Sequence, residues 1–400
     1  MAGIYLHIPF CRQACSYCDF YFITRTKRIG EFVDQLVADI ESSNGWHEPI
    51  ATIYFGGGTP SLLSPQQLDR ILTALQQRFD CSQVQETTLE CNPENITKDY
   101  LQDVAALGID RLSMGVQSFN EKLLKFMHRV HSREEALTAM ELVKAFGPKN
   151  FTFDLIYGNP GQSLDMLDDD ITTMLGFEPP HVSAYALTIE PKTRLGKQAE
   201  LGRLEAADDD IVNQHFDLIG ERLSDAGIQR YEVSNYAIPG FEAAHNSNYW
   251  RHHSYFGFGP GAHSLLWQVD GNSAMRIENG EFTSKTGSGV RRDQHSGDGN
   301  DSDPSGLQDL WLTGLNQGLG EVLNLSTLAD EYILMRLRTL EGLDLQLLES
   351  RYNLVLNASQ RGFVADLEKR GLANSDDTLK LTTEGLKLAD RIALEIVSRG

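Results

Sequence analysis

Strand-like and helix-like stretches alternate through the first half of the chain. Helical periodicity marks Ile29–Ser42 and a second segment that begins after Ser64, with Pro65 in its first turn. Apolar runs between the helical segments predict six strands: Ile4–Ile8, Ala51–Phe55, Glu86–Glu90, Arg111–Gly115, Asn150–Tyr157 and Val182–Tyr185. Repeated strand–helix units predict an α/β fold with a parallel sheet and right-handed crossovers. Six units fit an open partial barrel, in which functional residues gather at the carboxyl ends of the strands.

A different pattern follows after about residue 230. Three strand-like runs would extend the sheet: Tyr231–Tyr236, Tyr255–Phe258 and Ser264–Trp267. Residues 284–306 are nearly all polar, which predicts a flexible surface insertion. The remainder is mostly helical, in an order that resembles a winged-helix-like module: Glu331–Leu340, Ser359–Arg370, a short strand Leu379–Thr382, and Thr383–Val397. We therefore divide the chain into a barrel (1–230), a sheet extension (231–283), the insertion (284–306) and a mostly helical C-terminal domain (307–400).

Composition excludes several classes of partner. The 400 residues carry a net charge of −21, which argues against binding to nucleic acids or anionic membranes. For the same reason, packing or protein contact explains the winged-helix-like module better than DNA binding does. No apolar run reaches membrane-spanning length, and the N-terminus lacks a signal-peptide pattern. Five cysteines, three of them close together, indicate a reducing, cytoplasmic compartment.

Those three cysteines carry the strongest chemical signal. Cys11, Cys15 and Cys18 follow the first strand with the spacing Cys-x-x-x-Cys-x-x-Cys. Three thiolates on one tight loop can hold three irons of a 4Fe–4S cluster and leave the fourth iron open to an external ligand. A zinc site with His7 as a fourth ligand and three buried thiols are the alternatives, but His7 precedes the loop. The two other cysteines are interpreted as inert thiols, Cys81 and Cys91.

This loop, with Tyr17 before its last cysteine, resembles the radical S-adenosylmethionine (radical SAM) superfamily. The wider string resembles the branch that contains oxygen-independent coproporphyrinogen III oxidase and related heme chaperones, over nearly the whole chain. The resemblance implies a partial (β/α)6 barrel. It also implies that the amino and carboxylate groups of S-adenosylmethionine chelate the open iron.

Residues at the strand ends form the implied S-adenosylmethionine site. Gly56-Gly57-Gly58-Thr59-Pro60 ends the second strand, where glycines let the backbone approach a ligand closely, although a tight turn is the plainer interpretation. Glu90 closes the third strand and could accept hydrogen bonds from ribose hydroxyls or cap a helix. Gln117, Arg129 and Asp154 are supported mainly by the resemblance. Tyr5 is implied by the resemblance too, but it could equally be a core aromatic. The full set is Tyr5, Tyr17, Gly57, Gly58, Thr59, Glu90, Gln117, Arg129 and Asp154.

A second motif, His245-Asn246-Ser247-Asn248-Tyr249-Trp250, lies in the sheet extension. Spacing alone favours a polar loop with core aromatics. The motif matches, however, a His-Asn-x-x-Tyr pattern that the heme-chaperone branch associates with heme, so the resemblance implies heme binding by His245 and Tyr249.

Two functions compete. The first is a heme chaperone that passes heme to acceptor proteins such as respiratory hemoproteins; the second is the radical decarboxylase of coproporphyrinogen III. The oxidase pattern has a further cysteine where this chain has Phe20, and an arm before the cluster where only ten residues precede Cys11. Both departures favour the chaperone. No catalytic residue is assigned from the sequence, and a homodimer is left open.

Overall fold

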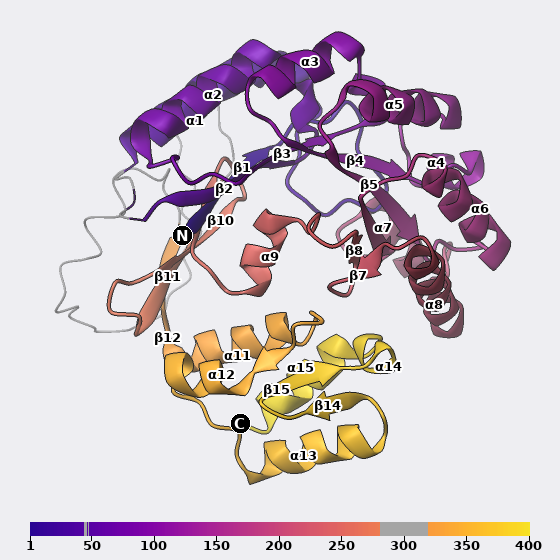
Figure 1. Ribbon diagram of the computed structural model, residues 1–400. Helices are drawn as coiled ribbons and strands as arrows, with labels where there is room; N and C mark the ends of the chain where they lie inside the picture. The colour runs from indigo at the N-terminus through magenta and orange to yellow at the C-terminus, as the bar shows by residue number, and fades with distance from the viewer. Residues whose placement is uncertain (44–45, 47, 281–318) are drawn as a thin grey trace.

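The computed structural model describes residues 1–400 except 44–45, 47 and 281–318 (Figure 1). The predicted flexible insertion at 284–306 therefore lies outside the described residues. Within the rest of the chain, no helix is long and apolar enough to cross a membrane.

A curved sheet forms the centre of the molecule. Its first six strands run parallel in chain order: β1 (Ala2–Ile8), β2 (Ile50–Gly57), β3 (Glu86–Cys91), β4 (Arg111–Gln117), β5 (Asn150–Tyr157) and β6 (His181–Ala186). The predicted strand Tyr255–Phe258 is β9, and it pairs in parallel with β1. The parallel α/β barrel expected from the sequence is thus confirmed.

Helices cover the outer, convex face of this sheet (Figure 1). They are α1 (Ile29–Ser42), α2 (Pro65–Arg78), α3 (Lys98–Ala106), α5 (Arg133–Phe146), α6 (Leu164–Leu175) and α8 (Asp209–Asp225). Local sequence fixes where several begin: Ser64 and Ser132 each form a capping box with the Gln or Glu three residues later. Two short helices, α4 (Glu121–Phe126) and α7 (Arg194–Glu200), lie near the cysteine loop.

The two faces of the sheet differ in polarity because strand side chains alternate. Ile4, Leu6 and Ile8 of β1 are fully buried in the apolar core shared with the outer helices. The inner face is polar at the amino ends of the strands. There the Arg111 guanidinium donates to Glu86 Oε2 at 3.5 Å and to Thr152 Oγ1 at 3.2 Å. The barrel interior can therefore hold a polar ligand, whereas its outer side is an ordinary hydrophobic core.

The segment after the barrel departs from the prediction in two places. Tyr231–Tyr236 is not one strand: β7 (Gln229–Arg230) and β8 (Asn235–Ala237) pair antiparallel around a turn. The turn is stabilised by the buried carboxylate of Glu232, which accepts from the backbone of Ser234 and the side chain of Asn235. The segment that spacing alone presented as a polar loop is a short helix, α9 (Ala244–Trp250).

Helix α9 lies on the concave side of the sheet, between the barrel and the C-terminal module (Figure 1). Its first turn is held at the amino ends of the strands, because the backbone N–H groups of Ala244 and His245 donate to the Glu86 carboxylate at 3.0 and 2.9 Å. Helix α9, which carries the His245–Trp250 motif, therefore closes the end of the barrel at the amino ends of the strands, here called the bottom of the barrel.

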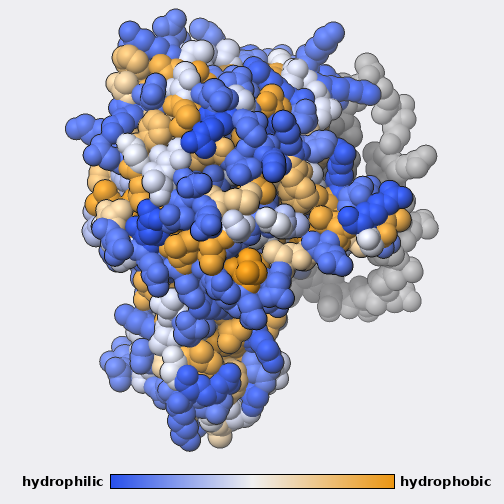
Figure 2. Space-filling model, turned by 90° about the vertical axis from the view of Figure 1, so that its right-hand side faces the viewer, coloured by the Kyte–Doolittle hydropathy of each residue, from blue (hydrophilic) through white to orange (hydrophobic). Residues whose placement is uncertain are grey.

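Three antiparallel strands continue the sheet beyond β9: β10 (His263–Trp267), β11 (Ser273–Glu278) and β12 (Leu319–Asn324). The C-terminal module then combines helices with a small sheet: α11 (Leu325–Arg336), β13 (Leu343–Asp344), α12 (Leu345–Tyr352), α13 (Ala358–Lys369), β14 (Ala373–Ser375), β15 (Thr378–Leu381), α14 (Thr383–Leu386) and α15 (Ala389–Ser398). Its first helix begins earlier than predicted because Asn324 caps it, and the last predicted helix is broken into two. Figure 2 shows this module as a narrower lobe beside the larger barrel.

Candidate cluster and cofactor site

The cysteine loop is held at the carboxyl end of β1 by contacts with distant segments. The backbone N–H of Ser16 donates to Met127 O at 3.1 Å, and its hydroxyl donates to Phe126 O at 2.8 Å. The Leu195 N–H donates to Ser16 O at 3.0 Å, which attaches the loop to α7. The side chain of Gln13 donates to His128 O at 2.9 Å. These bonds hold the loop against the end of α4 and against α7.

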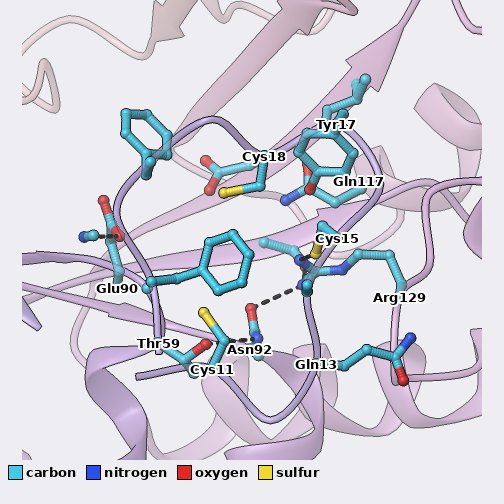
Figure 3. Close-up of a pocket in the computed structure, with 18 of the residues that line it drawn as sticks. Cys11, Gln13, Cys15, Tyr17, Cys18, Thr59, Glu90, Asn92, Gln117 and Arg129 are labelled. Carbon is cyan, nitrogen blue, oxygen red and sulfur yellow. Dashed lines mark hydrogen bonds between the residues drawn. The ribbon is translucent and has the colours of Figure 1, made fainter. Parts of the chain in front are cut away.

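Cys11, Cys15 and Cys18 lie on this loop and are half-buried (Figure 3). Burial raises the pKa of the Cys11 thiol to about 12 and also raises the pKa of Cys18. A thiol in such surroundings becomes a thiolate when a metal cation lies beside it. Arg129 supplies a further positive charge, since its Nη1 donates to Cys15 Sγ at 3.4 Å.

The spacing of the thiols suits a cluster. Among the described residues, no group of three or more His, Cys, Asp or Glu side chains is placed to hold one metal ion. Figure 3 shows the three labelled cysteine sulfurs spread around the mouth of a pocket, not gathered at one point. Three thiols on one loop match the number of protein ligands of a 4Fe–4S cluster that keeps one iron open.

A cavity of about 650 Å³ extends from this loop into the carboxyl ends of the strands. Its wall includes Gly57, Gly58 and Thr59, which connect β2 to α2. Gly57 has φ of +106°, and a Cβ on it would meet the His7 ring at 2.6 Å. A Cβ on Gly58 would meet Phe10 O at 2.8 Å. Glycine is therefore required here by the close approach of β2 to the cysteine loop.

Two half-buried carboxylates, Glu90 and Asp154, line the same cavity. Burial raises the pKa of Glu90 and the pKa of Asp154 to about 7 each. Glu90 accepts from the Tyr54 hydroxyl at 2.7 Å and from the Gly57 N–H at 3.1 Å, while Asp154 accepts from the Ser113 hydroxyl at 3.2 Å. Perturbed carboxylates in a cleft are typical of ligand sites, where a cation or a hydroxyl donor compensates the buried charge.

Gln117 owes its position to a distortion of β4. The pairing with β5 shifts register between Gly115 and Gln117, and Gln117 adopts φ of +68°. Its buried Oε1 has no hydrogen-bond partner among the described residues. A Cβ on Gly115 would lie 2.7 Å from Gln117 Nε2, so the glycine makes room for this side chain. An unpaired buried acceptor in the cavity wall is what a donating ligand would satisfy.

Arg129 completes this side of the cavity. Its Nη2 donates to Asn92 Oδ1 at 2.8 Å and to Gly115 O at 2.9 Å, which aims the guanidinium at the cysteine loop (Figure 3). Tyr17 also lines the cavity, but Tyr5 does not: its hydroxyl bonds His7 Nδ1 at 3.2 Å beneath the wall. The structure thus brings together every residue predicted for S-adenosylmethionine except Tyr5.

Several lining residues were missed by the sequence analysis: Tyr54, Cys91, Asn92, Ser113 and Tyr185. Most follow the alternation of the inner face, since Tyr54 lies two residues before Gly56 and Asn92 two after Glu90. Counting in twos from Gly56, Glu90 and Gly115 would have found Tyr54, Asn92 and Ser113. Cys91 is buried, and burial raises the pKa of its thiol well above the usual range.

The structure does not bring His245 and Tyr249 to this cavity. His245 is buried, and its ring bonds the Thr52 hydroxyl through Nδ1 at 2.8 Å and the Tyr249 hydroxyl through Nε2 at 2.8 Å. Burial lowers its pKa to about 3. The ring also stacks on Tyr54, with centroids 5.0 Å apart. In this arrangement both ring nitrogens of His245 are engaged in hydrogen bonds.

Comparisons with known proteins agree with this architecture. The family model for the radical SAM superfamily matches residues 5–174, and that for the HemN C-terminal domain matches residues 323–388. The chain is 38% identical to heme chaperone HemW of Lactococcus lactis over 66% of this chain and 69% of the relative. It is 38% identical to heme chaperone HemW of Escherichia coli over 67% of this chain and 71% of that one.

Among solved structures, coproporphyrinogen III oxidase (HemN) from Escherichia coli, described as a radical SAM enzyme, superposes with a TM-score of 0.76. The match covers 99% of this chain and 90% of the other at 20% identity, and so supports the fold alone. Fold, cysteine loop and sequence identity agree: the chain belongs to the heme chaperone HemW family of the radical SAM superfamily.

Proposed function

We propose that this protein is a heme chaperone that binds heme, transfers it to acceptor proteins, and carries a 4Fe–4S cluster and S-adenosylmethionine. The observation that carries the proposal is the cavity at the cysteine loop, where three thiols, two half-buried carboxylates and an unpaired amide line one space. Membership of the HemW family supplies the link to heme. The cysteines favour a reducing, cytoplasmic compartment.

Each residue of the site has a role that its surroundings support. Cys11, Cys15 and Cys18 would ligate three irons of the cluster, which supplies an open iron and one-electron redox chemistry. The Arg129 guanidinium, beside Cys15 Sγ, would offset the negative charge of the thiolates. Gly57, Gly58 and Thr59 would contact the amino group of S-adenosylmethionine.

The remaining residues would orient the cofactor. Glu90 would accept from the ribose hydroxyls, and Gln117 and Asp154 would hold its sugar and carboxylate ends. Tyr17 would cover the loop, whereas Tyr5 would act from beneath by supporting His7. By this proposal residues 1–230 hold the cofactors, and 231–283 and 307–400 close and extend the barrel.

Anaerobic reconstitution tests the cofactor half of the proposal. The chain should bind about four irons and four sulfides, and S-adenosylmethionine should change the electron paramagnetic resonance spectrum of the reduced cluster. An unchanged spectrum at saturating S-adenosylmethionine would contradict the proposed site. Stoichiometric zinc without iron–sulfur absorption would contradict the cluster.

A transfer experiment tests the chaperone half. Heme-loaded protein is mixed with the apo form of a b-type cytochrome, and the cytochrome spectrum is followed. Transfer faster than from heme bound to serum albumin supports the chaperone. The same preparation, given coproporphyrinogen III, S-adenosylmethionine and a reductant, should form no protoporphyrinogen IX. Steady formation of that product would instead assign the oxidase activity.

A further inference from the structure

A second cavity, of about 350 Å³, lies on the other side of the cysteine loop. Its lining comes from the loop, from the end of α4, and from α7 with the residues that follow it: Ser16, Lys125, Phe126, His128, Arg194, Leu195, Gln198, Arg203 and Leu204. Every titratable side chain in this lining is basic. None of the side chains in its wall is a carboxylate, although the whole chain carries a net charge of −21. We call it the basic pocket.

The basic pocket is built on the anchored part of the loop. Ser16 bonds Phe126 O through its hydroxyl at 2.8 Å and accepts from the Leu195 N–H at 3.0 Å, so α4, the loop and α7 are held together. Arg194 Nη1 lies 3.1 Å from His128 Nδ1. Because a guanidinium can only donate, His128 Nδ1 is the acceptor in this hydrogen bond.

The cations of the basic pocket lack internal counter-ions. Within the described part of the chain, Lys125, Arg194 and Arg203 form no ion pair with an Asp or Glu. Elsewhere, partly exposed arginines do find such partners, as Arg251 does with Glu341 and Arg338 with Asp390. Unpaired cations that share a concave site with apolar side chains favour an anion attached to an apolar body.

We propose that the basic pocket binds the propionate carboxylates of heme. This inference rests on the proposed function, which requires a heme site. Heme is a planar apolar ring with two carboxylates on one edge. Lys125, Arg194 and Arg203 can pair with the carboxylates, while Phe126, Leu195 and Leu204 contact the ring edge. His245, the residue that the sequence associated with heme, is enclosed at the amino ends of the strands.

Heme titrations of the full-length chain, followed by absorbance, test this site. The double variant Arg194→Gln/Arg203→Gln should bind heme about tenfold more weakly, because two solvent-exposed charge pairs are lost. The matched control is Lys369→Gln/Arg391→Gln, which removes the same charge from two exposed positions on the C-terminal module. The control should bind heme as the wild type does. Circular dichroism of each variant confirms folding.

Heme dimethyl ester, titrated in the same detergent, isolates the carboxylates. The wild type should prefer heme to the ester, and the double variant should lose most of that preference. Inorganic pyrophosphate, an anion without an apolar ring, should compete with heme for the wild type.

The outcomes separate the two proposals. Absence of heme binding by the wild type overturns the proposed function together with this inference. Heme binding that is equal in the double variant and the control overturns the inference alone. An equal loss of affinity for heme and its ester, or pyrophosphate binding without competition, overturns the assignment of the propionates to the basic pocket.

Discussion

Replacing Glu90 by glutamine should stabilise the protein without cofactors while weakening its binding of S-adenosylmethionine. Burial raises the pKa of Glu90 from 4.5 to about 7. With the folded pKa above the unfolded one, the stability that Glu90 contributes is fully present below about pH 4.5 and is lost as the pH rises through about 7. The shift corresponds to about 3 kcal/mol at pH 8, at 1.36 kcal/mol per pKa unit.

Glutamine removes the buried charge but keeps an oxygen that can accept from the Tyr54 hydroxyl. It loses the bond from the Gly57 N–H, worth about 1 kcal/mol. The unfolding free energy of Glu90→Gln relative to that of wild type should therefore rise by roughly 2 to 3 kcal/mol as the pH increases from 5 to 8. If Glu90 binds ribose hydroxyls, the affinity for S-adenosylmethionine should fall about tenfold, since a charge-assisted bond becomes a neutral one.

Urea denaturation of the apo chain at both pH values measures the first effect, and a cofactor titration of the reconstituted protein measures the second. Glu349→Gln, at an exposed position on α12, is the control and should show neither effect. A stability difference between wild type and Glu90→Gln that does not change from pH 5 to pH 8 would refute the reasoning about the buried charge. Unchanged cofactor affinity would remove Glu90 from the site.

Three further predictions follow from the site. Alanine at any of the three loop cysteines should abolish iron binding after reconstitution, whereas Cys91→Ala should retain it; equal iron content would refute the ligand set. Gly115→Ala should leave the fold intact but weaken S-adenosylmethionine binding about tenfold, because its Cβ displaces Gln117. His245→Ala should lower the free energy of unfolding by roughly 2 to 4 kcal/mol, because it leaves a cavity and two unpaired hydroxyls, with heme stoichiometry unchanged. Loss of heme with unchanged stability would instead support His245 as an iron ligand.

The parallel strands and the cysteine loop were readable from sequence because their signals are local. The apolar runs of β1 to β6 and the caps at Ser64 and Ser132 depend on residues a few positions apart. The spacing of the three cysteines is likewise contained in eight residues. The order of the strands then placed their carboxyl ends, and hence Glu90 and Asp154, at one edge.

Other features depend on contacts between distant segments. The turn within Tyr231–Tyr236 requires a buried Glu232, which no alternation of apolar residues reveals. The left-handed conformation of Gln117 arises from a register shift against β5. The helix at His245 is stabilised by Glu86, more than 150 residues earlier in the chain. The local pattern of this segment therefore indicated a polar loop, whereas long-range hydrogen bonds stabilise a helix there.

Helix α9 also determines how ligands would reach the barrel. It lies at the amino ends of β2 and β3, where it bonds Thr52 and Glu86, and the cavity opens at the opposite ends, past the cysteine loop and the exposed ring of Phe20. A molecule seated against Glu90 and Asp154 would enter and leave past that loop. A bulky ligand bound across the cysteine loop would block the release of the molecule inside the cavity. The ligand that binds last would therefore have to dissociate first.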